Sequence, residues 1–342
     1  MIIRSKAPLR LGLAGGGSDL DPYCSEFGGL VLNSTINLYS HCTIVERDDN
    51  LIQFTAQDLH YSEEIKSSKF IEPAGDLCLH KGVYNKIIKE FNLEPLSFNL
   101  ITRSDAPPGS GLGSSSAIVV SMVKAYAEWL NLPLGEYEIA FLAYQIERED
   151  LKLSGGKQDQ YAAAFGGFNL MEFYSNNRTI INPLRIKRWI VNEFESSIVL
   201  YFTGVSRSSA KIIDEQIKNS SGRVKSYIES THSLKQDATQ MKELLLKGEI
   251  SSIGKILQNS WENKKRLANS ITNSKIDEIM KLAKEAGAIS GKVSGAGGGG
   301  FILFIVDPSN KHYLKKTLNK TNGNTIEFQF TQGGTHSWKI YN

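Results

Sequence analysis

Pro107-Pro108-Gly109-Ser110-Gly111-Leu112-Gly113-Ser114-Ser115-Ser116-Ala117 is the most informative segment of this 342-residue chain. Apolar residues recur after it at three- and four-residue spacings, which predicts a helix with one apolar face. They are Ile118, Val119, Met122, Val123, Tyr126, Trp129 and Leu130. A glycine-rich loop that opens a helix presents unpaired backbone N–H groups and the positive end of the helix dipole, and both attract phosphate. We therefore predict that this segment cradles the phosphates of a nucleotide.

The predicted phosphate loop comprises Pro108, Gly109, Ser110, Gly111, Leu112, Gly113, Ser114, Ser115 and Ser116. Glycine lets the backbone approach an anion closely, and serine hydroxyls are oxygen ligands of the kind that Mg²⁺ prefers. A flexible turn with a serine helix cap is the alternative, but the prolines, the glycine spacing and the apolar helix together favour phosphate. No Gly-Lys-Ser/Thr follows, so the segment is not a Walker loop. It also lacks the acidic partner of a dinucleotide-binding fingerprint.

Composition narrows the class of protein. Hydrophobic residues make up 41% and charged residues 22% of the chain, as in ordinary soluble globular proteins. The formal net charge of +3 is too small to favour nucleic acid or an anionic membrane as a partner. Cys24, Cys42 and Cys78 have no metal-like spacing, so we expect reduced thiols and a cytoplasmic location. We find no signal peptide and no membrane-spanning run, and we expect small-molecule partners and a monomer or homodimer.

Another glycine-rich loop lies near the N-terminus. Residues 2–13 predict a pair of strands broken near Pro8, and Gly15-Gly16-Gly17-Ser18-Asp19 follows. Successive glycines leave the backbone open to a ligand, so Gly17, Ser18 and Asp19 are predicted to contact a substrate. A turn with an aspartate helix cap is the alternative. Arg10 precedes the loop and would place a permanent cation beside a transferring phosphoryl group, unless it is an exposed strand arginine.

Glu147 lies near the C-terminal end of a helix predicted over residues 136–153. A carboxylate there opposes the helix dipole, and a bound cation would compensate. We therefore predict that Glu147 and Ser115 hold Mg²⁺. Solvated ion pairs with Arg148 and Lys152 are the alternative.

Asp159 follows a Gly155-Gly156 turn at the start of a further predicted helix. It is predicted to be either a helix cap or a catalytic carboxylate. Lys157 is a cation two residues away that would keep the carboxylate ionised. An ionised aspartate beside an acceptor hydroxyl can act as a base.

The second half of the chain is mostly helical over residues 210–286, and its lysines are interpreted as solvated surface. Arg207 lies in a loop that opens a helix and is predicted to bind a phosphate on the substrate, with a plain helix start as the alternative. Residues 294–300 form a third glycine loop, predicted to face an earlier one and to form a wall of the active site. Gly297 and Gly298 are its predicted substrate contacts. Strands at 325–330 and 337–341 are expected to close the smaller domain.

Three of these segments, in this order, resemble the motifs of the GHMP small-molecule kinases, such as galactokinase, homoserine, mevalonate and phosphomevalonate kinases. Ala7-Pro8-Leu9-Arg10 through Asp19 is similar to the first motif, residues 107–117 to the ATP-phosphate loop, and residues 294–300 to the third. The resemblance implies a two-domain α+β fold. Residues 1–190 would form an ATP-binding domain like ribosomal protein S5 domain 2, and residues 191–342 a ferredoxin-like domain.

Gly15-Gly16-Gly17-Ser18-Asp19 replaces the galactokinase-type Gly-Glu-His-Thr-Asp and is similar to a branch of sugar-1-kinases. That branch includes heptose 7-phosphate kinases and the kinase part of fucokinases. The resemblance implies that the C1 hydroxyl of D-glycero-α-D-manno-heptose 7-phosphate is phosphorylated with ATP and Mg²⁺, for GDP-heptose and surface-glycan synthesis. A fucokinase-like enzyme acting on an unphosphorylated sugar is the alternative.

Roles for individual residues follow from the same resemblance. Asp159 would orient or deprotonate the sugar hydroxyl, and Arg10 would stabilise the transferring phosphoryl group. Asp19 would bind sugar hydroxyls, and Lys157 and Arg207 would favour a phosphorylated sugar. A binding protein without chemistry and a nucleotidyltransferase are the rival classes.

Overall fold

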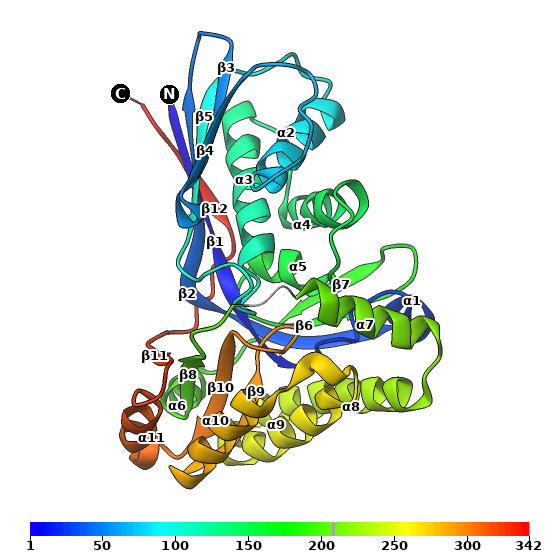
Figure 1. Ribbon diagram of the computed structural model, residues 1–342, viewed down its shortest axis with the longest axis vertical. Coiled ribbons are helices and arrows are strands. Elements are labelled where there is room, and N and C mark those ends of the chain that lie inside the picture. The colour runs from blue at the N-terminus through cyan, green and yellow to red at the C-terminus, as the bar shows by residue number, and fades with distance from the viewer. Residues whose placement is uncertain (207–208, 342) are drawn as a thin grey trace.

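The computed structural model describes residues 1–206 and 209–341, which fold into two β-sheets with helices packed on them (Figure 1). The larger sheet has the order β12-β1-β2-β5-β3-β4, and β6 extends it from β2 and pairs with β7. Its strands are β1 (Ile2–Ala14), β2 (Gly29–Glu46), β3 (Leu51–Ala56), β4 (Tyr61–Lys66), β5 (Phe98–Ser104), β6 (Phe168–Phe173), β7 (Thr179–Pro183) and β12 (His336–Ile340). The smaller sheet has the order β11-β8-β10-β9, built from β8 (Ile198–Phe202), β9 (Ala288–Val293), β10 (Phe301–Val306) and β11 (Asn324–Ile326).

Helices from each half of the chain cover these sheets. Those of the first half are α1 (Tyr23–Phe27), α2 (Cys78–Glu90), α3 (Ser114–Leu130), α4 (Glu136–Tyr144) and α5 (Gln158–Phe165). Those of the second half are α6 (Arg188–Ser196), α7 (Ala210–Ser221), α8 (Lys225–Lys247), α9 (Ile250–Lys265), α10 (Ser274–Glu285) and α11 (Lys311–Leu318). Short 3-10 turns η1 (Gln57–Leu59), η3 (Asn269–Ile271) and η4 (Pro308–Asn310) and a π-helical turn η2 (Gln145–Asp150) complete the described elements.

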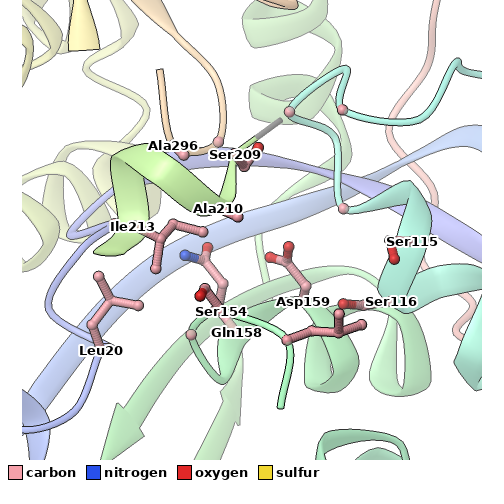
Figure 2. A pocket seen from close by; sticks show the side chains of 18 of the residues that line it. Leu20, Ser115, Ser116, Ser154, Gln158, Asp159, Ser209, Ala210, Ile213 and Ala296 are labelled. Atoms are coloured by element: carbon pink, nitrogen blue, oxygen red, sulfur yellow. The ribbon is translucent and has the colours of Figure 1, made fainter. Parts of the chain in front are cut away.

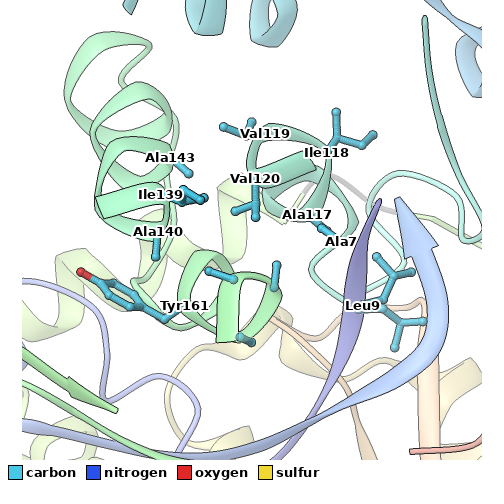
Figure 3. Packing of buried hydrophobic residues seen from close by; sticks show 14 of the residues in the cluster. Ala7, Leu9, Ala117, Ile118, Val119, Val120, Ile139, Ala140, Ala143 and Tyr161 are labelled. Atoms are coloured by element: carbon cyan, nitrogen blue, oxygen red, sulfur yellow. The ribbon is translucent and has the colours of Figure 1, made fainter. Parts of the chain in front are cut away.

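The helix predicted after the phosphate loop is α3, and it lies at the centre of the first unit. Its side chains are buried on almost every side, as expected of a helix that is apolar all round. It packs on β1 and β2 and against α4 and α5. Figure 3 shows this apolar layer, in which Val120 of α3, Ile139 of α4 and Tyr161 of α5 converge. The packing holds the N-terminal end of α3, and so the phosphate loop, in a fixed position.

Two expectations about strands are corrected by the sheet pairing. Residues 2–13 form one continuous strand, and the predicted break near Pro8 is a shift of register against β2 between Pro8 and Leu9. The predicted strand at 337–341 does not close the smaller domain. As β12, it pairs antiparallel with β1 in the larger sheet, and the two chain ends lie together in Figure 1. The pairing covers the outer edge of β1, which would otherwise expose unpaired backbone groups.

Two long helices of the second unit pack on the two sheets. α8 packs on β1 and β2 of the larger sheet, whereas α9 packs on β9 of the smaller one. The loop over residues 294–300 connects the antiparallel strands β9 and β10 and therefore points toward the first unit. The expected α+β architecture in two units is confirmed. The domain boundary at residues 190 and 191 falls within α6 and stays a prediction.

Candidate active site

A cavity of about 550 Å³ lies where the two units meet, and Figure 2 shows it from close by. Most residues that the sequence singled out line it: Arg10, Gly17, Asp19, Pro108, Gly109, Gly111, Gly113, Ser114, Ser115, Ser116, Glu147 and Asp159. They come from β1, both glycine loops of the first unit, α3, η2 and α5. Segments that are far apart in the chain thus share one cavity.

The phosphate loop and the third glycine loop meet backbone to backbone. Gly109, Gly111 and Gly113 all have positive φ, at 72°, 82° and 76°. A Cβ added to Gly111 would lie 2.6 Å from the Ser294 carbonyl oxygen, and one added to Gly295 would lie 2.6 Å from the Cα of Gly111. The prediction that the third loop faces an earlier one is confirmed. Glycine is required here because no side chain fits between the two loops.

Arg10 and Asp159 form a partly buried ion pair beside the phosphate loop. The Arg10 Nε and Nη2 lie 2.8 and 2.7 Å from Oδ1 of Asp159, and Nη1 donates to the Gly111 carbonyl at 2.6 Å. Arg10 is 5% exposed, so it is held as a fixed cation. Within residues 1–206 and 209–341, Oδ2 of Asp159 accepts no hydrogen bond and is free to receive one from a ligand. In Figure 2, Asp159 lies between Gln158 and the first turn of α3.

Glu147 projects from η2, a π-helical turn that widens the end of α4. Such turns often occur at functional sites because they redirect a side chain. Glu147 is 1% exposed, and its Oε2 accepts from Gln160 Nε2 at 2.5 Å. Gln160 also donates to Ser116 Oγ at 3.2 Å, whereas Ser115 is exposed to the cavity. No cluster of three His, Cys, Asp or Glu side chains suits a metal in the described residues. A cation here would therefore rest on Glu147, a serine hydroxyl and the ligand's own oxygens.

Asp19 lines the cavity, but its carboxylate is committed to other groups. Its Oδ2 accepts from the backbone N–H groups of Lys157 and Gln158 at 3.0 and 3.2 Å. Its Oδ1 accepts from Gln158 Nε2 and the Gly17 N–H, both at 3.2 Å. Asp19 therefore caps the N-terminus of α5, the helix that carries Asp159. The cap considered from the sequence exists, though on a different helix from the one that follows Asp19.

Comparison with known proteins identifies the family. Residues 79–167 match the GHMP kinases N terminal domain and residues 241–322 match the GHMP kinases C terminal domain. Over 338 residues the chain is 53% identical to the D-glycero-alpha-D-manno-heptose 7-phosphate kinase of Campylobacter jejuni, with 99% of each chain covered. The chain belongs to the GHMP kinase family.

Two further proteins are similar to this GHMP kinase. A crystal structure of a D-glycero-D-manno-heptose 1-phosphate kinase from Bacteriodes thetaiotaomicron superposes with a TM-score of 0.86 at 50% identity, covering 99% of this chain and 100% of the other. The bifunctional fucokinase/GDP-fucose pyrophosphorylase of Arabidopsis thaliana is 26% identical over 89% of this chain and 30% of its own length. The resemblance drawn from the three motifs and the expected two-domain kinase fold are confirmed. No described helix of the kinase has the length and apolar character of a membrane span.

Lys157 and Ser18 are predicted substrate contacts of this kinase, but neither lines the cavity. Lys157 is 4% exposed and directs its Nζ to Asp21 at 3.1 Å and to the ring of Tyr144. The cation bonded to Asp159 is Arg10 instead, so the expectation about Lys157 is wrong. Ser18 is fully buried, because its hydroxyl donates to the Gly15 carbonyl and accepts from the Leu30 N–H.

Some residues of the glycine loops line the cavity, whereas others are buried against neighbouring segments. Ser110 and Leu112 are buried, and the Ser110 carbonyl accepts from the Phe301 N–H at 2.9 Å. Gly297 and Gly298 pack against Ile271, and Gly295 and Ala296 line the cavity in their place. These four residues, which were predicted as ligand contacts, thus hold the loops in place. Arg207 lies outside the described residues.

Sequence reasoning missed two buried polar residues of the kinase that line the cavity. Gln216 of α7 is 2% exposed, and its Oε1 would lie 3.3 Å from a Cβ on Gly17. Lys264 of α9 is 4% exposed, although the lysines of this region were interpreted as solvated. The signal was present: Ile253, Leu257, Trp261 and Lys264 recur at helical spacing, which places Lys264 on the buried face of α9.

Burial shifts the pKa values of three ionisable groups near the cavity. Burial lowers the pKa of the Lys264 ammonium well below its usual value, and the positive charges of Lys292 and Arg10 act in the same direction. Burial also lowers the pKa of Lys292 to about 8, although the charge of Asp237 opposes this. The pKa of Asp237 is raised to about 6 by burial, with Lys292 opposing the rise. Burial therefore disfavours the charged forms of both lysines, and an anion in the cavity would favour the charged form of Lys264.

Proposed function

We propose that this kinase transfers the γ-phosphoryl group of ATP to the C1 hydroxyl of D-glycero-α-D-manno-heptose 7-phosphate, with Mg²⁺ as the metal ion. The observation that carries the proposal is the Arg10–Asp159 pair beside the phosphate loop in one cavity, in a chain 53% identical to a heptose 7-phosphate kinase. The product would be the 1,7-bisphosphate, an intermediate suited to GDP-heptose and surface-glycan synthesis.

The phosphate loop supports the assignment of ATP. Its three glycines of positive φ turn the backbone at alternate positions, and Gly113 directly precedes the first turn of α3. The N–H groups of that turn have no partner within the helix. Together with the positive end of the helix dipole, they form a site that attracts phosphate. Ser114 and Ser115 line the cavity beside them. We assign residues 108–116 to the phosphates of ATP on this basis.

The donor set supports Mg²⁺. Ser115 would contribute a hydroxyl oxygen and Glu147 a carboxylate oxygen, and Mg²⁺ prefers such ligands together with substrate phosphates. Gln160 would hold the Glu147 carboxylate in place through its Nε2 donor. The ion would supply neutralisation of the charge on the phosphate oxygens.

Asp159 and Arg10 supply the chemistry that the chain itself performs. Oδ2 of Asp159 would accept the proton of the C1 hydroxyl as that oxygen bonds to the γ-phosphorus. The bond between the γ-phosphorus and the bridging oxygen breaks, and ADP leaves with the electron pair. Arg10 would hold the Asp159 carboxylate in position and stabilise the phosphoryl charge. Positioning and charge stabilisation dominate phosphoryl transfer, so these fixed groups suit the reaction.

A fucokinase-like enzyme acting on an unphosphorylated sugar is the second candidate. It rests on the 26% identity to the Arabidopsis thaliana fucokinase, against 53% for the heptose 7-phosphate kinase. Because Lys157 faces Asp21, it gives no support to a phosphorylated substrate. The identity over the whole chain therefore decides our preference.

The deciding experiment measures ADP release with D-glycero-D-manno-heptose 7-phosphate, heptose 1-phosphate, free heptose and L-fucose as acceptors. We expect the highest kcat/KM with the 7-phosphate and a new anomeric phosphate by phosphorus NMR. A higher kcat/KM with a free sugar would reject heptose 7-phosphate as the substrate. Release of pyrophosphate in place of ADP would reject the kinase and indicate a nucleotidyltransferase.

We also propose a cytoplasmic location and a monomeric or homodimeric state. The free thiols of Cys24, Cys42 and Cys78 support the location, because they suit a reducing compartment. Light scattering of the purified protein tests the oligomeric state, and a tetramer or larger assembly would reject it.

A further inference from the structure

Lys264 is a buried lysine in the lining of the active-site cavity. Its side chain projects from the penultimate position of α9, is 4% exposed and lines the same cavity as Arg10 and Asp159. Its Nζ donates to the carbonyl of Gly295. In the part of the chain that the structure describes, no carboxylate lies within ion-pair distance of this Nζ, and no other acceptor bonds to it.

Such an arrangement is unfavourable unless an anion enters the cavity. An ammonium carries three donors, and a buried charge without a partner is strongly destabilising. Arg10 is already paired with Asp159, and Lys292 donates to the carbonyls of Gly12 and Leu13 at 3.4 and 3.1 Å. Among the described residues of the cavity lining, Lys264 is thus a lysine whose donors remain for a ligand.

The contacts of Lys264 locate the anion. Its acceptor, Gly295, abuts Gly111 of the phosphate loop, and Arg10 donates to the Gly111 carbonyl. The Ser294 hydroxyl donates to the same carbonyl at 2.8 Å, so the two loops and both cations form one connected cluster. Lys264 and Arg10 therefore reach the same end of the phosphate loop from different units of the fold. Asp159, the acceptor of the sugar proton, lies at this end as well.

We propose that Lys264 binds the transferring phosphoryl group, as a second cation acting alongside Arg10. The inference rests on the proposed function. As the sugar oxygen bonds to the γ-phosphorus and the bond to the bridging oxygen of ADP breaks, Lys264 donates to a non-bridging oxygen and keeps its proton. The sugar proton leaves to Asp159.

The test compares Lys264→Met, Lys264→Arg and Lys264→Ala with the matched control Lys265→Met. Lys265 is the adjacent lysine, partly exposed and paired with Glu262 at 2.9 Å on the surface. We expect Lys264→Met to lower kcat by about 100-fold or more, as for loss of one preorganised donor. The Kd of ADP, which lacks the γ-phosphate, should stay within about threefold of the wild-type value. Lys264→Arg should recover part of kcat, and Lys265→Met should leave it unchanged.

Amine rescue separates binding of the phosphoryl group from a merely structural role. Ethylammonium added to Lys264→Ala should raise kcat in a saturable manner and leave the wild type unaffected, because the small cation fills the vacated site. If Lys264 only anchors the Gly295 loop, ADP affinity and Tm fall together and the amine has no effect, which overturns the proposal. A loss confined to KM for the phosphorylated sugar, absent with free heptose, also overturns it, because Lys264 would then bind the sugar's own phosphate.

The controls keep this inference separate from the proposed function. A wild-type enzyme that releases no ADP with any sugar phosphate rejects the proposed function. A wild-type enzyme that is active, with Lys264→Met equally active, rejects the role of Lys264 alone.

Discussion

Replacement of Asp19 by alanine tests whether this residue holds α5 or contacts the sugar. The carboxylate accepts four hydrogen bonds, two of them from the backbone N–H groups of Lys157 and Gln158 at the start of α5. Asp159 lies in the same first turn, so its position depends on the cap. Asp19 is 2% exposed, so its removal would leave these donors buried without their acceptor.

The magnitude follows from these contacts. Loss of a helix N-cap costs about 0.5–2 kcal/mol, and each buried donor left without an acceptor costs about 1–3 kcal/mol before water compensates. We expect Asp19→Ala to lower the free energy of unfolding by about 2–4 kcal/mol. For a chain of this size the corresponding fall in Tm is about 3–6 °C. Because the cap also fixes Asp159, kcat should fall more than the KM for the sugar rises.

Denaturant unfolding, calorimetry and steady-state kinetics check this together, with the exposed Asp48→Ala as the control. Asp48→Ala should leave Tm and kcat unchanged. An Asp19→Ala enzyme with wild-type Tm and kcat, but a large rise in KM for the sugar alone, would refute the capping argument. That result would restore the sugar contact predicted from the sequence.

Three further predictions concern the charged groups around the cavity. Asp159→Asn should lower kcat by about 10²–10⁴-fold while ADP binding persists, and undiminished turnover would remove Asp159 from the mechanism. Glu147→Gln should raise the Mg²⁺ concentration needed for half-maximal activity by at least about tenfold, while Glu149→Gln, on the exposed side of the same turn, should not. The pKa of Lys292 is lowered from 10.5 to about 8 by burial, so the unfolded chain binds more protons between these values, and stability contributed by this group rises with pH there. Lys292→Met should therefore flatten the dependence of Tm on pH between 8 and 10.5, and an unchanged pH profile would contradict the assignment.

Local patterns in the sequence were sufficient for the phosphate loop, α3 and the kinase family. Alternating glycines ahead of an apolar helix restrict the backbone to a turn that few other sequences adopt, and both features are encoded by neighbouring residues. Arg10, Glu147 and Asp159 were recognisable for a similar reason, because each lies within or beside a glycine-rich or helical segment of characteristic spacing. All three line the predicted cavity in the structure.

The direction of individual side chains was decided only by the tertiary structure. Lys157 and Asp159 are two residues apart, yet one faces Asp21 and the other faces Arg10, because α5 begins between them and Asp19 caps it. The sequence suggests that Lys264 is a surface lysine. In the structure it is buried, because α9 packs against β9 and Lys264 reaches the Gly295 carbonyl of the third glycine loop. Likewise, only the open edge of β1 determines where the last strand pairs. Spacing along a chain reports which groups are near in sequence, whereas burial and charge pairing depend on contacts between segments more than a hundred residues apart.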